Sequence, residues 1–282
     1  MNEGSAAGAD RLLDLLHGVR LTPTQRRIAH CLVRHSGAVA YLSAAEVAEL
    51  AGVSQPSVTR FAMALGHDGY PALRRRLREL TTTPAADRAD TGNALQRAVR
   101  TEMDNLDRLA GQLADADRIA GVGRLLAASR PLPVLGLRAA APLAAYFAYF
   151  AAKIHPDVRV LDHGGSMLAD RVDQAVAAGA SALLAFVLPR YPRETLDALR
   201  EARDAGLTVV AITDSPVSPA TEHAEVVLPA AVGTDLVFDL HTAPMTLAMV
   251  VLQAICDAAP AETQTRLEAF ESSAARRQLF LG

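Results

Sequence analysis

The chain has 282 residues, a length that suits two domains, because one hydrophobic core rarely exceeds roughly 200 residues. Half of the residues are apolar and 21% are charged, which argues against long disordered tracts. The two cysteines form no CxxC pair, and the uncharged stretches 139–152 and 240–256 are shorter than the roughly 20 residues of a membrane span. We therefore expect a cytoplasmic protein without a disulfide framework, a metal, another cofactor or a membrane span.

Charge is unevenly distributed along the chain, whose net charge is −3. Residues 20–80 contain nine arginines and four acidic residues, a net charge of +5, so the remainder carries −8. A basic segment on an acidic protein indicates that this segment alone meets a polyanion such as DNA. An arginine-rich helix face that contacts only solvent is the alternative.

Residues 9–80 carry the signals of consecutive short helices. The signals, in chain order, are leucines 12, 13, 15 and 16, the pair Thr22-Pro23 for a helix to about Arg34, the capping box of Ser43 and Glu46, Ser54 with Pro56, and Tyr70-Pro71. Glycines close two of these helices. Gly52 is expected to end the third helix, and Gly66 the fourth.

The segment 44–61 predicts a helix-turn-helix. Ala48 is small where two helices cross, Gly52 supplies the positive φ of the turn, and apolar residues, Val47, Val53, Val58 and Phe61, face a shared core. Three-helix cores that bind no DNA share part of this pattern. The short or forked donors on the fourth helix favour DNA, because they suit phosphates and base edges. The predicted DNA contacts are Ser43, Ser54, Gln55, Ser57, Thr59, Arg60 and Arg74.

The second half of the chain alternates helical and strand patterns. A long helical pattern leads from Ala94 to Leu125, and apolar strand candidates follow at 133–136, 158–161, 182–187, 208–213 and 225–228. Apolar strands alternating with helices predict a parallel sheet covered on both faces. The fold class is therefore α/β overall, an all-α domain followed by a three-layer domain. We place the helix-turn-helix domain at 1–80, a linker at 81–93 and the α/β domain at 94–282.

The N-terminal pattern resembles that of the RpiR family of transcriptional regulators. The resemblance rests on 21–29, 42–48, 52–61 and 65–73, which read LTPTQRRIA, LSAAEVA, GVSQPSVTRF and LGHDGYPAL. That family joins this domain to a sugar isomerase (SIS) domain, and the order implied here is the same. Segments 211–219, 223–225 and 237–241 resemble later SIS segments.

The resemblance also implies two phosphate-binding loops, from which this chain departs. The family pattern G-x-G-x-S aligns with 136–140, where Arg138 and Ala140 replace glycine and serine. The pattern S-x-S-G-x-T aligns with 187–192, whose three hydroxyl positions hold Val187, Pro189 and Pro192. The loops gain arginines instead, and guanidinium groups bind carboxylate or phosphate through two parallel hydrogen bonds. Surface ion pairs are the alternative role of these arginines.

An anion site is therefore expected at the carboxyl ends of the strands, where open α/β sheets bind ligands. Its predicted residues are Arg138, Ser166, Arg190, Tyr191, Arg193, Glu194, Asp214, Ser215 and His241. Ser166 and His241 each stand at a predicted helix start, where capping is the commoner role.

The expected function is that of a DNA-binding transcriptional regulator whose SIS-like domain senses an anionic metabolite, a sugar phosphate or sugar acid. Its expected partners are an operator duplex, that metabolite and a second copy of the chain, held mainly by the α/β domain. One alternative is a DNA-binding protein whose SIS-like domain only forms dimers. Another is a phosphosugar isomerase with Glu194, His163 or His241 as the base.

Overall fold

The computed structural model describes Leu12, Leu13, Leu15, Leu16 and Val19, together with residues 21–36, 42–82 and 93–280. The chain forms two compact units. The first contains Met1–Arg97 and Pro216–Pro219, and the second contains Ala98–Ser215 and Ala220–Gly282. Most of the predicted linker, residues 83–92, lies outside the described residues.

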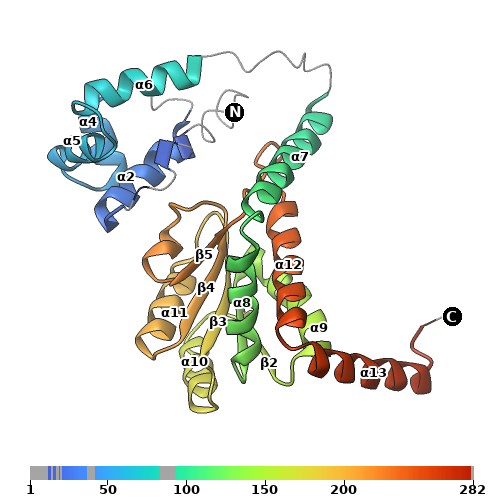
Figure 1. The fold of residues 1–282 in the computed structure, drawn as a ribbon. Helices are drawn as coiled ribbons and strands as arrows, with labels where there is room; N and C mark the ends of the chain where they lie inside the picture. The colour runs from blue at the N-terminus through green and yellow to red at the C-terminus, as the bar shows by residue number, and fades with distance from the viewer. Residues whose placement is uncertain are drawn as a thin grey trace. The chain divides into compact units, whose positions relative to one another are not determined.

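The first unit is a bundle of short helices (Figure 1). Its long elements are α2 (Pro23–Arg34), α4 (Ala44–Ala51), α5 (Gln55–Ala64) and α6 (Tyr70–Thr82). Both predicted starts at Thr22 and Ser43 are capping boxes, in which the hydroxyl accepts from the backbone three residues on. The shared core includes Leu12, Leu16, Ile28, Leu32, Val47, Val58, Phe61, Leu73 and Leu77. The helices predicted from caps and glycines are therefore confirmed.

The second unit begins with two helices rather than one. The pattern that starts at Ala94 divides into α7 (Ala94–Gln112) and α8 (Ala116–Ala128). Asp115 separates them, because its carboxylate accepts a hydrogen bond from the Arg118 N–H at 3.1 Å and caps α8. The uninterrupted apolar periodicity conceals this break.

A five-stranded parallel sheet forms the centre of the second unit. Its strands are β1 (Leu132–Gly136), β2 (Val158–Leu161), β3 (Ala182–Val187), β4 (Thr208–Thr213) and β5 (Val226–Pro229). Their order is β2-β1-β3-β4-β5, and every neighbouring pair is parallel. The predicted strands are confirmed, although β5 lies one residue later than expected.

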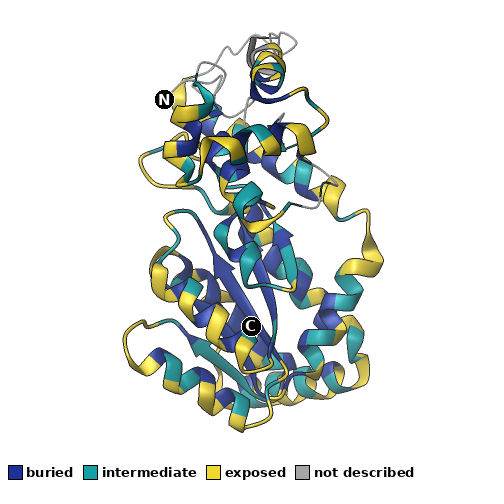
Figure 2. Ribbon diagram, turned by 90° about the vertical axis from the view of Figure 1, so that its left-hand side faces the viewer, coloured by how far each residue is buried: buried dark blue, intermediate teal, exposed yellow. Residues whose placement is uncertain are grey.

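Helices cover both faces of this sheet (Figure 1). One face packs against α8, α9 (Ala141–Ile154) and α12 (Thr242–Ala258), and the other against α10 (Met167–Ala177) and α11 (Arg193–Asp204). The central strands β1, β3 and β4 are almost wholly buried between these layers, whereas the edge strands β2 and β5 are partly exposed (Figure 2). The three-layer α/β architecture is therefore confirmed. The last helix, α13 (Pro260–Arg277), packs along α9.

The two uncharged stretches form helices of this unit. In the described part of the chain, no single helix is long and apolar enough to span a membrane. The pair α12 and α13 reaches that length and composition only when counted together, across a bend of 108°. One face of α12 is buried in the core of the unit, whereas α9 leaves Tyr146 and Tyr149 exposed.

Candidate functional sites

The turn between α4 and α5 has the backbone geometry of a helix-turn-helix. Gly52 adopts a left-handed conformation, with φ 61° and ψ 41°, and the Val53 N–H donates to the Ala48 carbonyl at 2.9 Å. Glycine adopts this conformation without the clash that a Cβ would cause. The turn brings the buried side chains of Val47 and Val58 into one core, so the outer face of α5 is fixed relative to α4.

That outer face of α5 carries a short polar network. Ser54 and Ser57 hydroxyls lie 2.9 Å apart, and Arg60 Nη2 donates to Ser57 Oγ at 3.3 Å. Ser54, Gln55 and Arg60 are exposed, and Ser57 and Thr59 are half-exposed. Ser54 stands at the predicted N-cap position, but its hydroxyl bonds Ser57 and not the backbone. Among the described residues, Arg60 donates to Ser57 alone, which leaves its other N–H groups available for phosphates or base edges.

Ser43 and Arg74 lie near the opposite end of α4. The Ser43 hydroxyl accepts from the Glu46 N–H at 3.2 Å, and the Ser43 N–H donates to Glu46 Oε2 at 2.7 Å. These hydrogen bonds from Ser43, and more weakly the charge of Arg74, hold the pKa of the exposed Glu46 below its usual value. Ser43 is therefore a helix cap first, and only its hydroxyl proton is free for a further contact.

The second unit presents its loops at the carboxyl ends of the strands. The chain passes from β1 to β2 at one side and then returns to β3 at the other, so the strand order reverses between β1 and β3. Ligands of open parallel sheets bind at such a reversal. Arg138 follows β1 and Arg190 follows β3, so the two predicted arginines flank this point.

Both arginines have an unusual backbone conformation. Arg138 has φ 54° and Arg190 has φ 62°, and the only other non-glycine residue with positive φ in the described part is Gln278, at the end of α13. Both side chains are exposed, as is that of Arg193 in the first turn of α11. None of the three forms an ion pair with another described residue, so the ion-pair alternative finds no partner there.

Tyr191 and Asp214 are brought together from two loops. The Tyr191 hydroxyl lies 2.8 and 2.9 Å from the two carboxylate oxygens of Asp214, which follows β4. Burial raises the pKa of Asp214, although the hydrogen bonds from Tyr191 and Thr213 act in the opposite direction. The hydrogen bonds of this pair join the loop after β3 to the loop after β4, and the carboxyl group of Asp214 accepts hydroxyl donors. Ser215, the next residue, is buried.

The loop after β2 lies against the start of α11. A side chain at Gly164 would collide with the carboxylate of Glu194, so glycine permits this close approach. Ser166 stands at the N-cap position of α10 but makes no capping hydrogen bond, and its side chain is exposed. The alternative role of Ser166, that of a side-chain cap, is therefore not observed, and its predicted role in anion binding stays a prediction. His163 Nδ1 lies 2.6 Å from Asp162 Oδ1 in the same loop.

The start of α12 is capped by a residue that sequence reasoning missed. His241 stands at the N-cap position without a capping hydrogen bond, so the alternative role of its side chain as a cap is not observed, and its predicted role in anion binding stays a prediction. Instead, the Thr242 N–H donates to Glu102 Oε2 at 3.2 Å, and Asn105 Nδ2 donates to Glu102 Oε1 at 2.8 Å. Glu102 is buried on α7. The available signal was its helical spacing, because it shares one face with buried Ala98 and Leu109.

The α7 helix also contacts the loop that precedes α12. Thr101 Oγ1 donates to Asp235 Oδ2 at 2.5 Å, and the loop is closed by an antiparallel bridge between Gly233 and Leu240. The loop thus connects the carboxyl edge of the sheet, where Asp239 acts on Asp214, to the helix that follows the predicted linker.

Two matches to known families agree with these two units. Residues 16–83 match the helix-turn-helix domain of the rpiR family, and residues 125–263 match the SIS domain. A helix-turn-helix joined to a SIS-type sheet defines a class of DNA-binding transcriptional regulators. Within that class, the chain belongs to the RpiR family.

Individual proteins are similar to the chain over 62% to 97% of its length. A Haemophilus influenzae protein described as an uncharacterized HTH-type transcriptional regulator is 23% identical over 218 residues, which are 74% of this chain and 75% of that protein. The Vibrio vulnificus NanR protein complexed with ManNAc-6P has a TM-score of 0.57 at 17% identity, covering 97% of this chain and 99% of that one. The sugar isomerase domain of an RpiR transcription factor from Sphaerobacter thermophilus has a TM-score of 0.54 at 21% identity, covering 62% and 97%. These two structures are similar to the chain in fold.

Proposed function

We propose that this regulator binds an operator duplex as a homodimer through α5, and that an anionic metabolite at the β1–β3 reversal controls the binding. The metabolite class is a sugar phosphate or a sugar acid. We infer a cytoplasmic regulator rather than an enzyme, because the Haemophilus influenzae relative is described as a transcriptional regulator and the Sphaerobacter thermophilus protein as a transcription factor. The NanR structure contains a sugar phosphate, which supports this ligand class for a chain of the same fold.

The observation that carries the effector proposal is the left-handed backbone of Arg138 and Arg190. For residues other than glycine this conformation costs about 1–2 kcal/mol each, so a glycine would be more stable at both places. Backbone strain of this kind is common at ligand sites, where the binding free energy of the side chain offsets the conformational free energy of the strained backbone. Two exposed guanidinium groups beside one strand reversal supply paired donors for a phosphate or carboxylate.

The effector proposal is tested with Arg138→Ala and Arg190→Ala in the full chain. Operator binding is measured by fluorescence anisotropy while N-acetylmannosamine 6-phosphate, hexose 6-phosphates or hexuronic acids are added. We expect at least one anion to change wild-type affinity, and both variants to lose that response while keeping their ligand-free affinity. Arg200→Ala is the matched control, since Arg200 is exposed on α11 and bonds Asp197 at 2.9 Å. A response to neutral sugars alone, or an intact response in both variants, would refute an arginine-based anion site.

The DNA proposal is tested with Gln55→Ala and Arg60→Ala together. Each good base contact contributes about 1–3 kcal/mol, so specific affinity for the operator should fall by at least tenfold in an electrophoretic shift assay. Met63→Ala is the matched control, because Met63 is exposed on the same helix and has no hydrogen-bond donor. Equal operator affinity of the double variant and the control would remove α5 as the reading helix.

A further inference from the structure

A hollow of about 500 Å³ lies between α9 and α13 in the second unit. Small-molecule pockets of proteins have this size, roughly 300–1000 Å³. Because α9 begins after β1 and ends before β2, its last turn, which holds Lys153, lies at the amino edge of the sheet. The hollow is therefore separate from the proposed anion site, which lies at the carboxyl edge.

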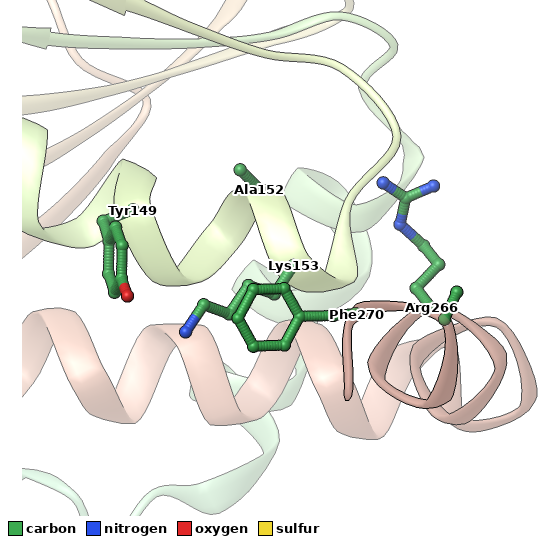
Figure 3. A pocket seen from close by; sticks show the side chains of 6 residues that line it. Tyr149, Ala152, Lys153, Arg266 and Phe270 are labelled. Atoms are coloured by element: carbon green, nitrogen blue, oxygen red, sulfur yellow. The ribbon is translucent and has the colours of Figure 1, made fainter. Parts of the chain in front are cut away.

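One face of each helix forms the walls of the hollow. Each helix contributes residues at positions i, i+3 and i+4, which share one helix face. Figure 3 shows these residues, which are Tyr149, Ala152 and Lys153 of α9 and Arg266, Ala269 and Phe270 of α13. Arg266 Nη2 donates to the His155 carbonyl at 2.9 Å and so ties α13 to the end of α9. The hollow is thus formed before any ligand arrives.

The ammonium group of Lys153 is surrounded by aromatic rings. Lys153 Nζ lies 4.4 Å from the centre of the Tyr149 ring, 4.3 Å from that of Phe270 and 5.2 Å from that of Phe150. Ring faces attract an ammonium group but supply no oxygen to accept its hydrogen bonds. Among the described residues, no carboxylate pairs with Lys153. Its three N–H donors therefore remain available to a ligand.

Arg266 adds positive charge to the hollow but no further donor pointing at Lys153. Figure 3 shows its guanidinium group pointing away from Lys153 Nζ. Its Nη2 is engaged with His155, and its Nε is buried without a hydrogen-bond partner in the described part of the chain. The six lining residues include no acid. The hollow thus combines apolar walls, a positive potential and one available donor group, an arrangement that suits a ligand with a single negative charge.

We propose that the hollow binds a small carboxylic acid with an aromatic or aliphatic body. The carboxylate accepts charge-assisted hydrogen bonds from Lys153 Nζ, while the body lies against Phe270 and the two alanines. Binding then removes apolar surface of both ligand and protein from water, which is favourable. This second ligand site goes beyond the proposed function and differs in chemistry from the anion site at the β1–β3 reversal.

Inorganic phosphate and sugar phosphates fit this hollow poorly. A phosphate group has several oxygens that lose their hydration on binding, and a single ammonium group cannot satisfy all of them. Without an apolar body, such a ligand would also leave the aromatic and alanine walls in contact with water. A monocarboxylate should therefore bind more tightly here than phosphate does.

Dye displacement on the full wild-type chain tests the ligand class. The probe is 8-anilinonaphthalene-1-sulfonate, an aromatic monoanion whose fluorescence rises when it binds an apolar site. We expect saturable binding that octanoate or benzoate displaces and that inorganic phosphate at the same concentration does not. The two acids distinguish a chain-shaped body from a ring. Absence of saturable binding, as when a second copy covers the hollow, or equal displacement by phosphate would overturn the proposal.

Two variants test the place of the site. Lys153→Met keeps the apolar stem and removes the donor, so the dissociation constant of the displacing acid should rise by at least about tenfold. Ala269→Trp leaves Lys153 in place and fills the hollow, so it should abolish binding. Arg276→Met is the matched control, since Arg276 is exposed on α13 and pairs with no described acid. Circular dichroism verifies that each variant is folded.

Arg138→Ala separates this site from the one at the carboxyl edge, and it should bind the acid as the wild type does. Wild-type affinity in Lys153→Met or in Ala269→Trp would overturn the site in the hollow. An equal loss of affinity in Arg276→Met would show that only the overall charge matters and would also overturn it. Loss of binding in Arg138→Ala would place the acid at the carboxyl edge of the sheet instead.

Discussion

Both units place glycines in left-handed backbone positions, but among the described residues only the second unit also places arginines there. In the first unit, the turn before α5 places Gly52 at φ 61°, where no side chain is needed. In the second unit, the loops after β1 and β3 place Arg138 and Arg190 at φ 54° and 62°. The turn between α4 and α5 only orients two helices, and its glycine adopts the left-handed conformation without strain. Strain at a loop residue is typical of ligand sites, so the comparison distinguishes a structural turn from the proposed anion site.

The largest expected contrast comes from one substitution made at two glycines. Gly52→Ala should lower the free energy of unfolding by about 1–2 kcal/mol, because alanine is strained at positive φ. Gly111→Ala on α7 should raise it by about 0.5–1 kcal/mol, because alanine is the better helix former. Urea unfolding monitored by circular dichroism measures both. Equal signs would mean that the turn before α5 does not depend on its left-handed residue.

Acidification should affect the two units in opposite directions. Burial, with smaller contributions from Arg34 and His35, lowers the pKa of His30 to about 4. The unfolded chain therefore binds a proton that the first unit does not, and this contribution is present above pH 6.5 and decreases as the pH falls toward 4. The loss is about 1–2 kcal/mol after a discount for the partial exposure of His30. In the second unit the raised pKa of Asp214 has the reverse sign, so that carboxyl group favours folding more as the pH falls.

Urea unfolding at pH 7.5 and pH 5 checks this difference. His30→Gln removes the titrating group, so the stability of that variant should depend less on pH than the stability of the wild type. A wild type and a His30→Gln variant with the same pH dependence would show that His30 does not carry the effect.

The smallest expected stability effect is a gain in the strained loops. Arg138→Gly and Arg190→Gly should each raise the free energy of unfolding by about 1 kcal/mol, since glycine removes the clash of the left-handed conformation. Both variants should nevertheless lose the response of operator binding to the anion. Thermal unfolding and fluorescence anisotropy measure the two effects on the same samples. If a variant becomes more stable and its operator binding still responds to the anion, the strained conformation has no role in anion binding.

Most of the fold was predictable from local signals. Capping boxes at Thr22 and Ser43 and the glycine at 52 indicated helix ends, and the buried parallel strands appeared as short apolar runs. The division between α7 and α8 was missed, because a cap at Asp115 interrupts the backbone without interrupting the apolar periodicity. Local patterns report burial better than they report hydrogen bonds.

The site was less accessible to sequence reasoning, because its key contacts join distant segments. The expected positions of Tyr191 and Asp214 at the sheet edge followed from their places after predicted parallel strands, but their direct hydrogen bond depends on the shape of the β3 loop. The capping of α12 is another example, because the Thr242 N–H donates to Glu102, 140 residues earlier in the chain. The missing cap at Ser54 has a local cause, since its hydroxyl bonds the neighbouring Ser57.

The capping contact of Glu102 also bears on how the chain folds during synthesis. Glu102 finds its partner at Thr242, 140 residues further along the chain. Domains fold as units and the N-terminal one is completed first, so the helix-turn-helix can fold while the polar group on α7 still faces water. Contacts this distant in sequence form late, because a long loop must close first. The ribosome must therefore complete α12 before α7 acquires its full set of native contacts.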